Sequence, residues 1–368
     1  MKTSMQTPIK ALVVCLLAVY LTPPPNAGNA LFVQSFRAPI PTPRSSRLPP
    51  LPSSSTSTSS TSSPPTSFTP SALTPPPLAP RPLPKFYYHW KKSNLKLNLF
   101  GAYYGFVAIS LGFIWYAVLK TIRLYTSIMS KLGITVDSKK SFGIRTNAIW
   151  GWFVLRLSYN WPIITGKKRV QKILLNSKTD DSPGVMYVAN HCSWMDIPFI
   201  AMSIGIRKNY KIIAKSELLK VPILGEAISV GENITVDRGS RKSQVKTYKE
   251  GLGWLREGVS LCTFPEGTRS RDGRLQAFKR GAFKMAEKTG AVIVPISISY
   301  CHILNPVDWV FPIRPARGIP VRVHVHDPIE TVGKTEDDIV EVVQRTLCEA
   351  LPECQQPIGG RMPGYDTS

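Results

Sequence analysis

A histidine and an aspartate five residues apart, His191 and Asp196, form the first pair of side chains whose types suggest acid–base chemistry. On one α-helix, five residues turn about 140° past a full turn, so the two side chains would not share a face. They can meet only if the chain turns between them, and Pro198 favours such a turn because it fits the first turn of a helix that begins near Asp196. The carboxylate would then fix the tautomer of His191 and leave its second ring nitrogen free to take a proton. The alternative is a histidine and a helix-capping aspartate with no shared task.

A second polar group follows the apolar run at 259–264, at the kind of strand end where α/β proteins form their sites. Its members are Glu266, Gly267, Thr268 and Arg269. Gly267 lets the backbone approach a ligand closely, and Arg269 offers a planar fork that suits phosphate oxygens. Lys279 precedes an expected helix, and a cation beside a helix N-terminus favours an anionic ligand. The alternatives are a solvated turn and a glutamate that only positions Arg269.

The elements that must position these groups alternate in type from residue 184 onward. Short runs rich in β-branched residues predict strands at 184–189, 211–214, 234–236, 259–264, 291–299 and 321–326. Helical periodicity predicts helices at 198–206, 240–257 and 282–289, and a capping-box-like start at 335–338 predicts a terminal helix. Asp237-Arg238 follows the expected strand at 234–236, either as an ion pair or as a second phosphate contact. This order predicts an α/β fold in which helices flank a mixed sheet.

The cysteines and the other histidines predict neither a disulfide scaffold nor a metal site. Six cysteines in 368 residues are ordinary usage, and they lack close pairs of metal-ligand spacing. Cys192 is next to His191, but adjacent side chains on an extended chain point apart, so we expect no acyl-enzyme at Cys192. We also expect no metal on His302, His324 or His326, the last two of which share a strand face.

The first 90 residues resemble targeting segments. Residues 1–30 contain two lysines, an apolar run of 11 residues and a possible cleavage triplet, as a signal peptide does. Residues 31–90 are rich in Ser, Thr and Pro and contain no acid, which predicts a transit peptide or a disordered linker. A signal followed by a transit peptide resembles the two-part presequence of algae whose plastids lie inside extra membranes. We therefore expect a plastid membrane location, with the endoplasmic reticulum membrane as the alternative.

Residues 91–165 are expected to be membrane-associated helices. The uncharged segment 97–119 has 23 residues, and at 1.5 Å per residue it is long enough to cross a bilayer with some tilt. A second apolar segment, 148–164, contains Arg156 and three tryptophans and is expected to be an interfacial helix. The alternative is that both segments are core helices.

Four short blocks in this order along the chain resemble the glycerophospholipid acyltransferase family. The blocks are Asn190-His191 to Asp196, Ile234 to Arg238, Phe264 to Ser270, and Val294-Pro295-Ile296. Segments between them, at 214–225 and 273–281, are similar to the family as well. The resemblance implies an acyltransferase domain at 166–352 with its motif core at 185–299, followed by a flexible tail at 353–368.

The resemblance also implies a reaction: transfer of a fatty acyl group from acyl-CoA or acyl-acyl carrier protein to the sn-2 hydroxyl of 1-acyl-sn-glycerol-3-phosphate. His191 would act as the base and Asp196 would orient it. The implied acceptor-binding residues are Glu266, Gly267, Thr268 and Arg269, assisted by Arg238 and Lys279. No cofactor and no metal are implied beyond the acyl donor. One departure from the family is Glu232, at a position that is usually glycine, which could change the pocket or shift the turn.

Two alternative functions remain. One is a related acyltransferase that uses glycerol-3-phosphate or another lysophospholipid. The other is a basic membrane adaptor, because the chain has 46 Lys and Arg against 23 Asp and Glu. We expect no nucleic-acid partner, because 13 of the cations precede the first acid, Asp137, and no nucleic-acid-binding motif appears. The oligomeric state is left open.

Overall fold

The computed structural model describes residues 82–90, 95–177, 183–205 and 208–358. All of them belong to one compact unit, Ser67–Ser368. The predicted signal peptide, nearly all of the predicted transit peptide or linker, and the last ten residues of the predicted tail lie outside the described residues.

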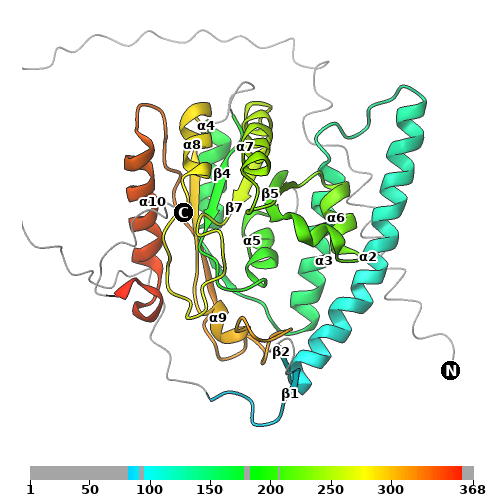
Figure 1. Ribbon diagram of the computed structural model, residues 1–368, viewed down its shortest axis with the longest axis vertical. Coiled ribbons are helices and arrows are strands. Elements are labelled where there is room, and N and C mark those ends of the chain that lie inside the picture. Colours follow the sequence, from blue (N-terminus) through cyan, green and yellow to red (C-terminus); the bar gives the residue numbers. More distant parts are fainter. Residues whose placement is uncertain (1–81, 91–94, 178–182, 206–207, 359–368) are drawn as a thin grey trace, which may run out of the picture. The chain divides into compact units, whose positions relative to one another are not determined.

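Seven strands form one mixed sheet in the order β3-β9-β8-β4-β7-β5-β6 (Figure 1). They are β3 (Ile163–Thr165), β4 (Met186–Ala189), β5 (Tyr210–Lys215), β6 (Ile234–Val236), β7 (Ser260–Thr263), β8 (Ile293–Ile298) and β9 (Arg322–Val325). The strands β4 to β8 are parallel, β9 is antiparallel to β8, and β3 is parallel to β9. The start of β3 and the end of β4 therefore lie at the same edge of the sheet. All six predicted strands are present, and the predicted mixed sheet is confirmed.

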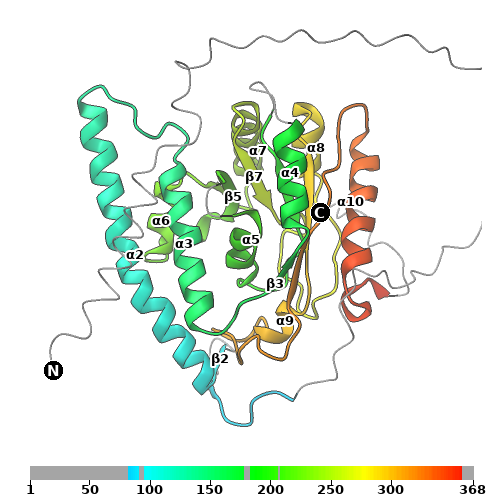
Figure 2. The same ribbon diagram turned by 180° about the vertical axis from the view of Figure 1, so that it is seen from behind.

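Helices cover both faces of this sheet (Figures 1 and 2). One face carries α3 (Ser141–Leu157), α4 (Lys167–Ser177) and α5 (Asp196–Ile204), and the other carries α7 (Arg241–Arg256), α8 (Gly281–Thr289) and α10 (Glu336–Ala350). Shorter elements connect them: η1 (Ser216–Lys220), α6 (Leu224–Val230), α9 (Cys301–Leu304) and η2 (Glu353–Gln355). The capping box predicted for the terminal helix is confirmed, because Thr335 and Asp338 exchange hydrogen bonds at the start of α10.

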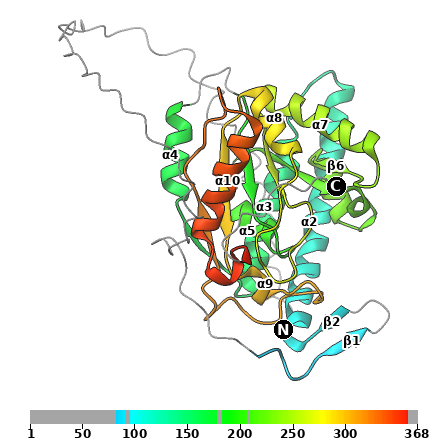
Figure 3. The same ribbon diagram turned by 60° about the vertical axis from the view of Figure 1, so that its left-hand side comes forward.

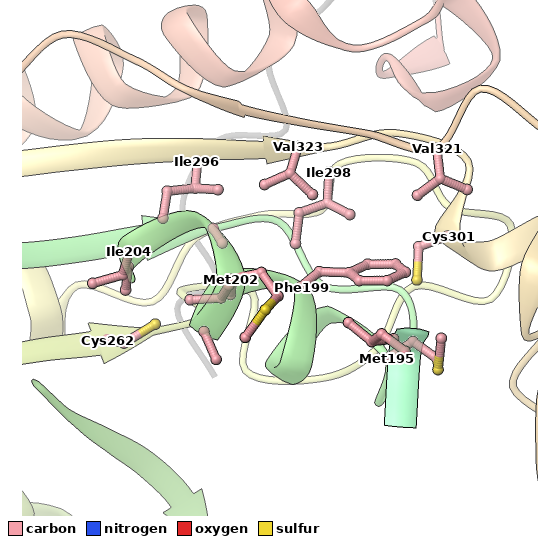
Figure 4. Packing of buried hydrophobic residues seen from close by; sticks show 14 of the residues in the cluster. Met195, Phe199, Met202, Ile204, Cys262, Ile296, Ile298, Cys301, Val321 and Val323 are labelled. Atoms are coloured by element: carbon pink, nitrogen blue, oxygen red, sulfur yellow. The ribbon is translucent and has the colours of Figure 1, made fainter. Parts of the chain in front are cut away.

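The strand β4 is buried on both faces, and its side chains alternate between two hydrophobic cores. Tyr187 and Ala189 belong to the core beneath α5, whereas Met186 and Val188 belong to the core beneath α8 and α10. Figure 4 shows the first core, where Phe199 and Met202 of α5 lie among the side chains of β8 and β9, including Ile296, Ile298 and Val323. A strand held on both faces fixes where its C-terminal end lies, and His191 is the second residue after that end.

The long helix α2 (Leu99–Lys131) replaces the shorter predicted segment 97–119. By length and composition it is the one helix among the described residues that could cross a membrane. One of its sides is buried against α3 and α6, and ion pairs from Lys120 and Arg123 to Glu226 hold its second half against α6. The other side exposes large apolar side chains, with Leu99 88%, Phe106 72% and Phe113 66% accessible. The helix therefore presents one apolar face to the protein and a second one to its surroundings.

Two predicted boundaries were wrong. The segment 148–164 is not one helix: α3 ends at Leu157, Tyr159 has a left-handed backbone, and β3 starts at Ile163 and pairs with β9. The flexible tail does not begin at 353, because Gln355 is fully buried and its side chain accepts a hydrogen bond from the Tyr300 N–H at 2.6 Å. The strands β1 (Tyr88–Trp90) and β2 (Leu95–Leu97), at the foot of α2 in Figure 3, were not predicted.

Candidate active site

The site is built on the loop between the end of β4 and the start of α5. Within this loop the Nδ1 atom of His191 lies 2.9 Å from the Oδ2 atom of Asp196. The chain turns between the two residues, and α5 begins at Asp196, so the predicted contact is present. His191 keeps 15% of its side chain accessible, whereas the Asp196 side chain is fully buried. The imidazole is thus reachable from solvent while its partner is not.

The Asp196 carboxylate is held by several donors at once. Its Oδ2 atom accepts hydrogen bonds from the backbone N–H groups of Cys192 at 2.8 Å and Ser193 at 2.9 Å, in addition to the bond from His191. An ionised carboxylate has no proton to donate, so the hydrogen bond with His191 must be donated by a protonated Nδ1. The Nε2 atom has no hydrogen-bond partner among the described residues and carries the free lone pair. A histidine in this tautomer can accept a proton at Nε2.

The imidazole plane is fixed by an aromatic neighbour that was not predicted. The ring of Phe264 stacks on His191 with 3.9 Å between the ring centroids and 18° between the planes. Phe264 directly follows β7, the strand next to β4. Its role could not be read from the sequence, because an aromatic residue at the end of a strand is equally suited to the core.

Glu266 joins the two loops of the site rather than facing outward. Its Oε1 atom accepts a hydrogen bond from the backbone N–H of His191 at 2.7 Å, and its Oε2 atom accepts one from the N–H of Gln276 at 3.2 Å. The Ser270 N–H donates to the His191 carbonyl at 2.8 Å, which ties the loops a second time. Burial raises the pKa of the Glu266 carboxyl well above its usual range. Its position therefore indicates that Glu266 positions His191 and does not contact an acceptor directly.

Gly267 occupies a turn that requires glycine. Its φ is +72°, and an added Cβ would lie 2.8 Å from Cε of Lys279. The Lys279 side chain thus crosses directly over the Gly267 backbone. Lys279 is also anchored through its backbone, because its N–H donates to the Pro265 carbonyl at 2.8 Å. This packing brings a lysine to the same turn as Glu266.

The other predicted acceptor-binding residues are exposed: Thr268 and Arg269 lie in this turn, and Arg238 lies in the turn after β6. Thr268, Arg269 and Arg238 are all exposed, and Arg238 follows β6 at the same edge of the sheet as His191. Within the described residues, no hydrogen bond or ion pair engages the guanidinium group of Arg238 or of Arg269. Asp237 does not pair with Arg238. Its Oδ1 atom accepts from the Gly239 N–H at 3.0 Å and closes the turn. Two cationic side chains thus remain available for an anionic ligand.

Two thiols lie behind the Asp196 carboxylate. Cys192 Sγ, Cys301 Sγ and an oxygen of Asp196 are within 4.8 Å of one another, and all three residues are buried. A hydrogen bond from Cys301 lowers the pKa of the Cys192 thiol, but burial and the charges of Asp196 and Glu266 outweigh it and raise that pKa to about 11. Burial also raises the pKa of Cys301 well above its usual range. Protonated thiols are poor nucleophiles and poor metal ligands, so we assign neither thiol a role in catalysis.

Burial lowers the pKa of each of the three remaining histidines near the sheet, His302, His324 and His326. Burial lowers the pKa of His302 to about 4 and that of His326 to about 3. His326 Nε2 lies 2.8 Å from Ser297 Oγ, and His324 Nδ1 lies 2.7 Å from Thr165 Oγ1. These two rings therefore pair with hydroxyl groups between neighbouring strands.

Glu232 lies in the turn that ends α6. The N–H of Glu232 donates to the Ser229 carbonyl and that of Asn233 donates to the Ile228 carbonyl, which is the Schellman arrangement at the end of α6. Glu232 itself adopts φ +45°, in the left-handed region where glycine is preferred. Its side chain forms an exposed ion pair with Lys140 at 3.6 Å. The departure from the family pattern is therefore accommodated in the backbone of a loop, next to β6.

The long helix α2 contacts the loop of the site. Tyr104 of α2 packs edge-to-face on Trp194, three residues after His191, with 5.7 Å between ring centroids. Phe311 packs against both rings. Gly105 makes this approach possible, because an added Cβ would lie 2.4 Å from the Phe311 ring. The aromatic cluster Tyr104–Trp194–Phe311 links the position of α2 to that of the His191 loop.

Comparison with known proteins supports the same region as the functional unit. The acyltransferase family model matches residues 163–299, which extend from β3 to the end of β8. The chloroplastic 1-acyl-sn-glycerol-3-phosphate acyltransferase of Arabidopsis thaliana is 36% identical over 182 residues, which make up 48% of this chain and 48% of that protein. The match thus spans about half the length of that relative.

A longer match links the chain to a coconut enzyme. The 1-acyl-sn-glycerol-3-phosphate acyltransferase of Cocos nucifera is 32% identical over 242 residues, which cover 61% of this chain and 76% of that protein. The crystal structure of the 1-acyl-sn-glycerophosphate acyltransferase PlsC from Thermotoga maritima aligns with a TM-score of 0.44 and 22% identity, over 66% of this chain and 96% of that one. The match covers 76% of the coconut enzyme at 32% identity. The chain therefore belongs to the acyltransferase family that includes the 1-acyl-sn-glycerol-3-phosphate acyltransferases.

Proposed function

We propose that this protein transfers a fatty acyl group from an acyl thioester to the sn-2 hydroxyl of 1-acyl-sn-glycerol-3-phosphate, which yields phosphatidate. The observation that carries the proposal is the 2.9 Å contact between His191 Nδ1 and Asp196 Oδ2, which leaves His191 Nε2 free. An alcohol is a poor nucleophile at neutral pH, so a base must take its proton as it attacks. His191 has the tautomer, the accessibility and the partner that this task requires.

The proposed reaction proceeds by direct transfer. His191 Nε2 takes the proton of the acceptor hydroxyl while the hydroxyl oxygen bonds to the carbonyl carbon of the thioester. The tetrahedral intermediate then collapses, the carbon–sulfur bond breaks, and the imidazolium returns the proton to the departing sulfur. Asp196 keeps the ring aligned and stabilises the imidazolium throughout. A thioester is already activated, so this sequence needs no metal and no cofactor besides the donor.

A phosphate-bearing acceptor suits the charges beside the dyad. Arg269 exposes a guanidinium group in the same turn as Glu266, and this group can bind phosphate oxygens in a bidentate manner. Arg238 is exposed farther along the same edge of the sheet, after β6. The names of the Arabidopsis and coconut relatives describe 1-acyl-sn-glycerol-3-phosphate acyltransferases. We assign Arg269 to the acceptor phosphate, with Thr268, Arg238 and Lys279 in supporting roles. We assign Glu266 and Gly267 to the shape of the turn.

The same proposal places the protein at a membrane. The accessible apolar face of α2, which includes Leu99, Phe106 and Phe113, is large enough to lie in lipid, and both the acceptor and the product are lipids. Through the cluster Tyr104–Trp194–Phe311, this face is coupled to the His191 loop. The chloroplastic name of the Arabidopsis relative favours a plastid membrane.

An assay of the purified full chain with a matrix of donors and acceptors tests the function. The donors are acyl-CoA and acyl-acyl carrier protein, and the acceptors are lysophosphatidate, glycerol-3-phosphate and lysophosphatidylcholine. We expect kcat/KM to be highest with lysophosphatidate. Faster turnover of glycerol-3-phosphate, or no acyl transfer with any pair, would contradict the proposal. A fluorescent fusion of residues 1–85, expressed in an alga with complex plastids, tests the location, and an endoplasmic reticulum pattern would argue against it.

A further inference from the structure

A cavity of about 770 Å³ opens where the chain passes from α3 into β3, on the far side of β8 and β9 from His191 (Figure 2 shows this connection). One wall is the segment 156–163 and the other is the segment 316–321. Backbone hydrogen bonds join the walls, from the Ala316 N–H to the Tyr159 carbonyl at 3.1 Å and from the Ile163 N–H to the Val321 carbonyl at 2.8 Å. The cavity is therefore a formed feature of the fold.

The charged groups of this cavity are all positive. Arg156 and Arg317 line it, one from each wall, and none of its ten lining residues is acidic. Among the described residues, neither guanidinium group forms an ion pair. The Arg156 guanidinium lies 5.9 Å from the ring centroid of Trp161, within cation–π distance, and both residues line the cavity. Two unneutralised arginines in one concavity favour an anion.

The rim of the cavity is apolar and accessible. Tyr159 is 69% and Ile163 51% exposed, and Tyr159 owes its outward position to a left-handed backbone with φ +57°. This rim lies near α2, because the hydroxyl of Tyr103 on α2 donates to the carbonyl of Leu157, two residues before Tyr159, at 2.7 Å. Tyrosine and tryptophan beside an apolar face are typical of the level at which lipid headgroups lie. The anion that fits is therefore one attached to an apolar tail.

We propose that this cavity binds the phosphate headgroup of an anionic membrane phospholipid, separately from the acyl acceptor. Arg156 and Arg317 bind the phosphate, Trp161 and Tyr159 contact the glycerol region, and the acyl chains lie along the α2 face. This proposal shares one premise with the proposed function, namely that the exposed face of α2 contacts the membrane, and it rests on the proposed function in that respect only.

The cavity and the catalytic dyad are two distinct places at one edge of the sheet. The start of β3 and the end of β4 share that edge, but β9 and β8 lie between them. Three strand spacings separate the start of β3, next to the cavity, from the end of β4, next to the dyad, by about 14 Å. A lipid in the cavity would orient the domain, so that the His191 edge faces the membrane that supplies its acceptor.

The test measures lipid binding to the full chain in the detergent dodecyl maltoside, with no acyl donor present. Phosphatidylglycerol and phosphatidylcholine with identical acyl chains are added at equal concentration, and native mass spectrometry quantifies each bound lipid. The variants are Arg156→Gln and Arg317→Gln. The matched control is Arg256→Gln, in the last turn of α7 at the opposite edge of the sheet. Circular dichroism confirms that each variant is folded.

We expect the wild type to prefer phosphatidylglycerol and each cavity variant to lose that preference by about fivefold, as expected for one cation near an anionic headgroup. The control should keep the wild-type preference. Equal loss in the control, or an unchanged preference in both cavity variants, would overturn the site. Displacement of phosphatidylglycerol by an equal concentration of inorganic phosphate would overturn the lipid assignment. Because binding is measured without turnover, a failed acyltransferase assay would not affect this result.

Discussion

Glu266 accepts a hydrogen bond from the backbone N–H of His191 at 2.7 Å, although the two residues are 75 positions apart in the chain. The second oxygen of the same carboxyl accepts from the Gln276 N–H. The charged turn that contains Glu266 thus holds the backbone of His191 in place. In the structure Glu266 acts through His191 and does not contribute to the exposed cationic surface of the turn.

Replacing this carboxyl by an amide should therefore affect kcat more than KM. In Glu266→Gln one acceptor oxygen becomes an NH₂ group that faces a backbone donor, which costs about 1–3 kcal/mol in a buried place. We expect kcat to fall about tenfold, with a lower melting temperature, while the KM for the acceptor changes little. The control is Glu287→Gln on the exposed side of α8. A large rise in the acceptor KM at unchanged kcat would show that Glu266 binds the acceptor instead.

Arg269 should show the opposite pattern. Lysine keeps the charge but cannot form the planar two-point contact of a guanidinium group with phosphate. In Arg269→Lys we expect the KM for lysophosphatidate to rise about tenfold and the KM for acyl-CoA to change less than twofold. Steady-state kinetics with each substrate varied in turn gives both values. An equal rise in both constants would contradict the assignment of Arg269 to the acceptor.

The left-handed backbone at Glu232 predicts that glycine at this position gives a more stable protein than alanine does. Glycine adopts this conformation without the cost of about 1 kcal/mol that other residues incur. The variants Glu232→Gly and Glu232→Ala both remove the ion pair with Lys140, so their difference isolates the backbone effect. We expect the glycine variant to be more stable than the alanine variant by about 1 kcal/mol in urea denaturation. Equal stability of the two variants would mean that the turn is not strained.

The lowered pKa of His326 predicts that the folded protein loses stability in acid. Burial, together with the nearby His324, lowers the pKa of His326 to about 3, so the folded protein binds fewer protons than the unfolded chain below about pH 6.5. Stability should therefore fall as the pH decreases through that range, by about 2 kcal/mol from this group between pH 6.5 and pH 5.

The variant His326→Gln isolates this contribution. It loses the hydrogen bond with Ser297, so it should be less stable than the wild type at pH 7. The gap between the two proteins should narrow at pH 5, because glutamine takes up no proton. Melting temperatures at both pH values measure this. A gap that stays constant or widens would mean that folding does not lower the pKa of His326.

The sequence predicted the parts of the site that depend on local signals. β6 has the predicted bounds, Ile234–Val236, because an apolar run and a charged turn delimit it. The turn between His191 and Asp196 followed from their spacing and from Pro198. Each of these inferences uses residues that are close together in the chain, where backbone preferences and side-chain types are informative.

What the sequence did not reveal depends on distant parts of the chain. β3 has only three residues and becomes a strand by pairing with β9, about 160 positions later. Glu266 reaches the His191 backbone, and Phe264 the His191 ring, only after β7 pairs with β4. The residues around Gln355 give no sign that its side chain bonds to the Tyr300 backbone, so the sequence predicts a flexible tail there.

The central claim is that His191 Nε2 accepts the proton of the acceptor hydroxyl, and the turnover number of His191→Ala tests it most directly. Acyl transfer to lysophosphatidate should be measured with the purified variant, with the exposed His89→Ala as the matched control. A general base contributes about a hundredfold to ten-thousandfold to the rate, so we predict a fall of that size in kcat, with folding and lipid binding unchanged. The control should keep wild-type turnover. A folded His191→Ala protein with near-wild-type kcat would contradict the account.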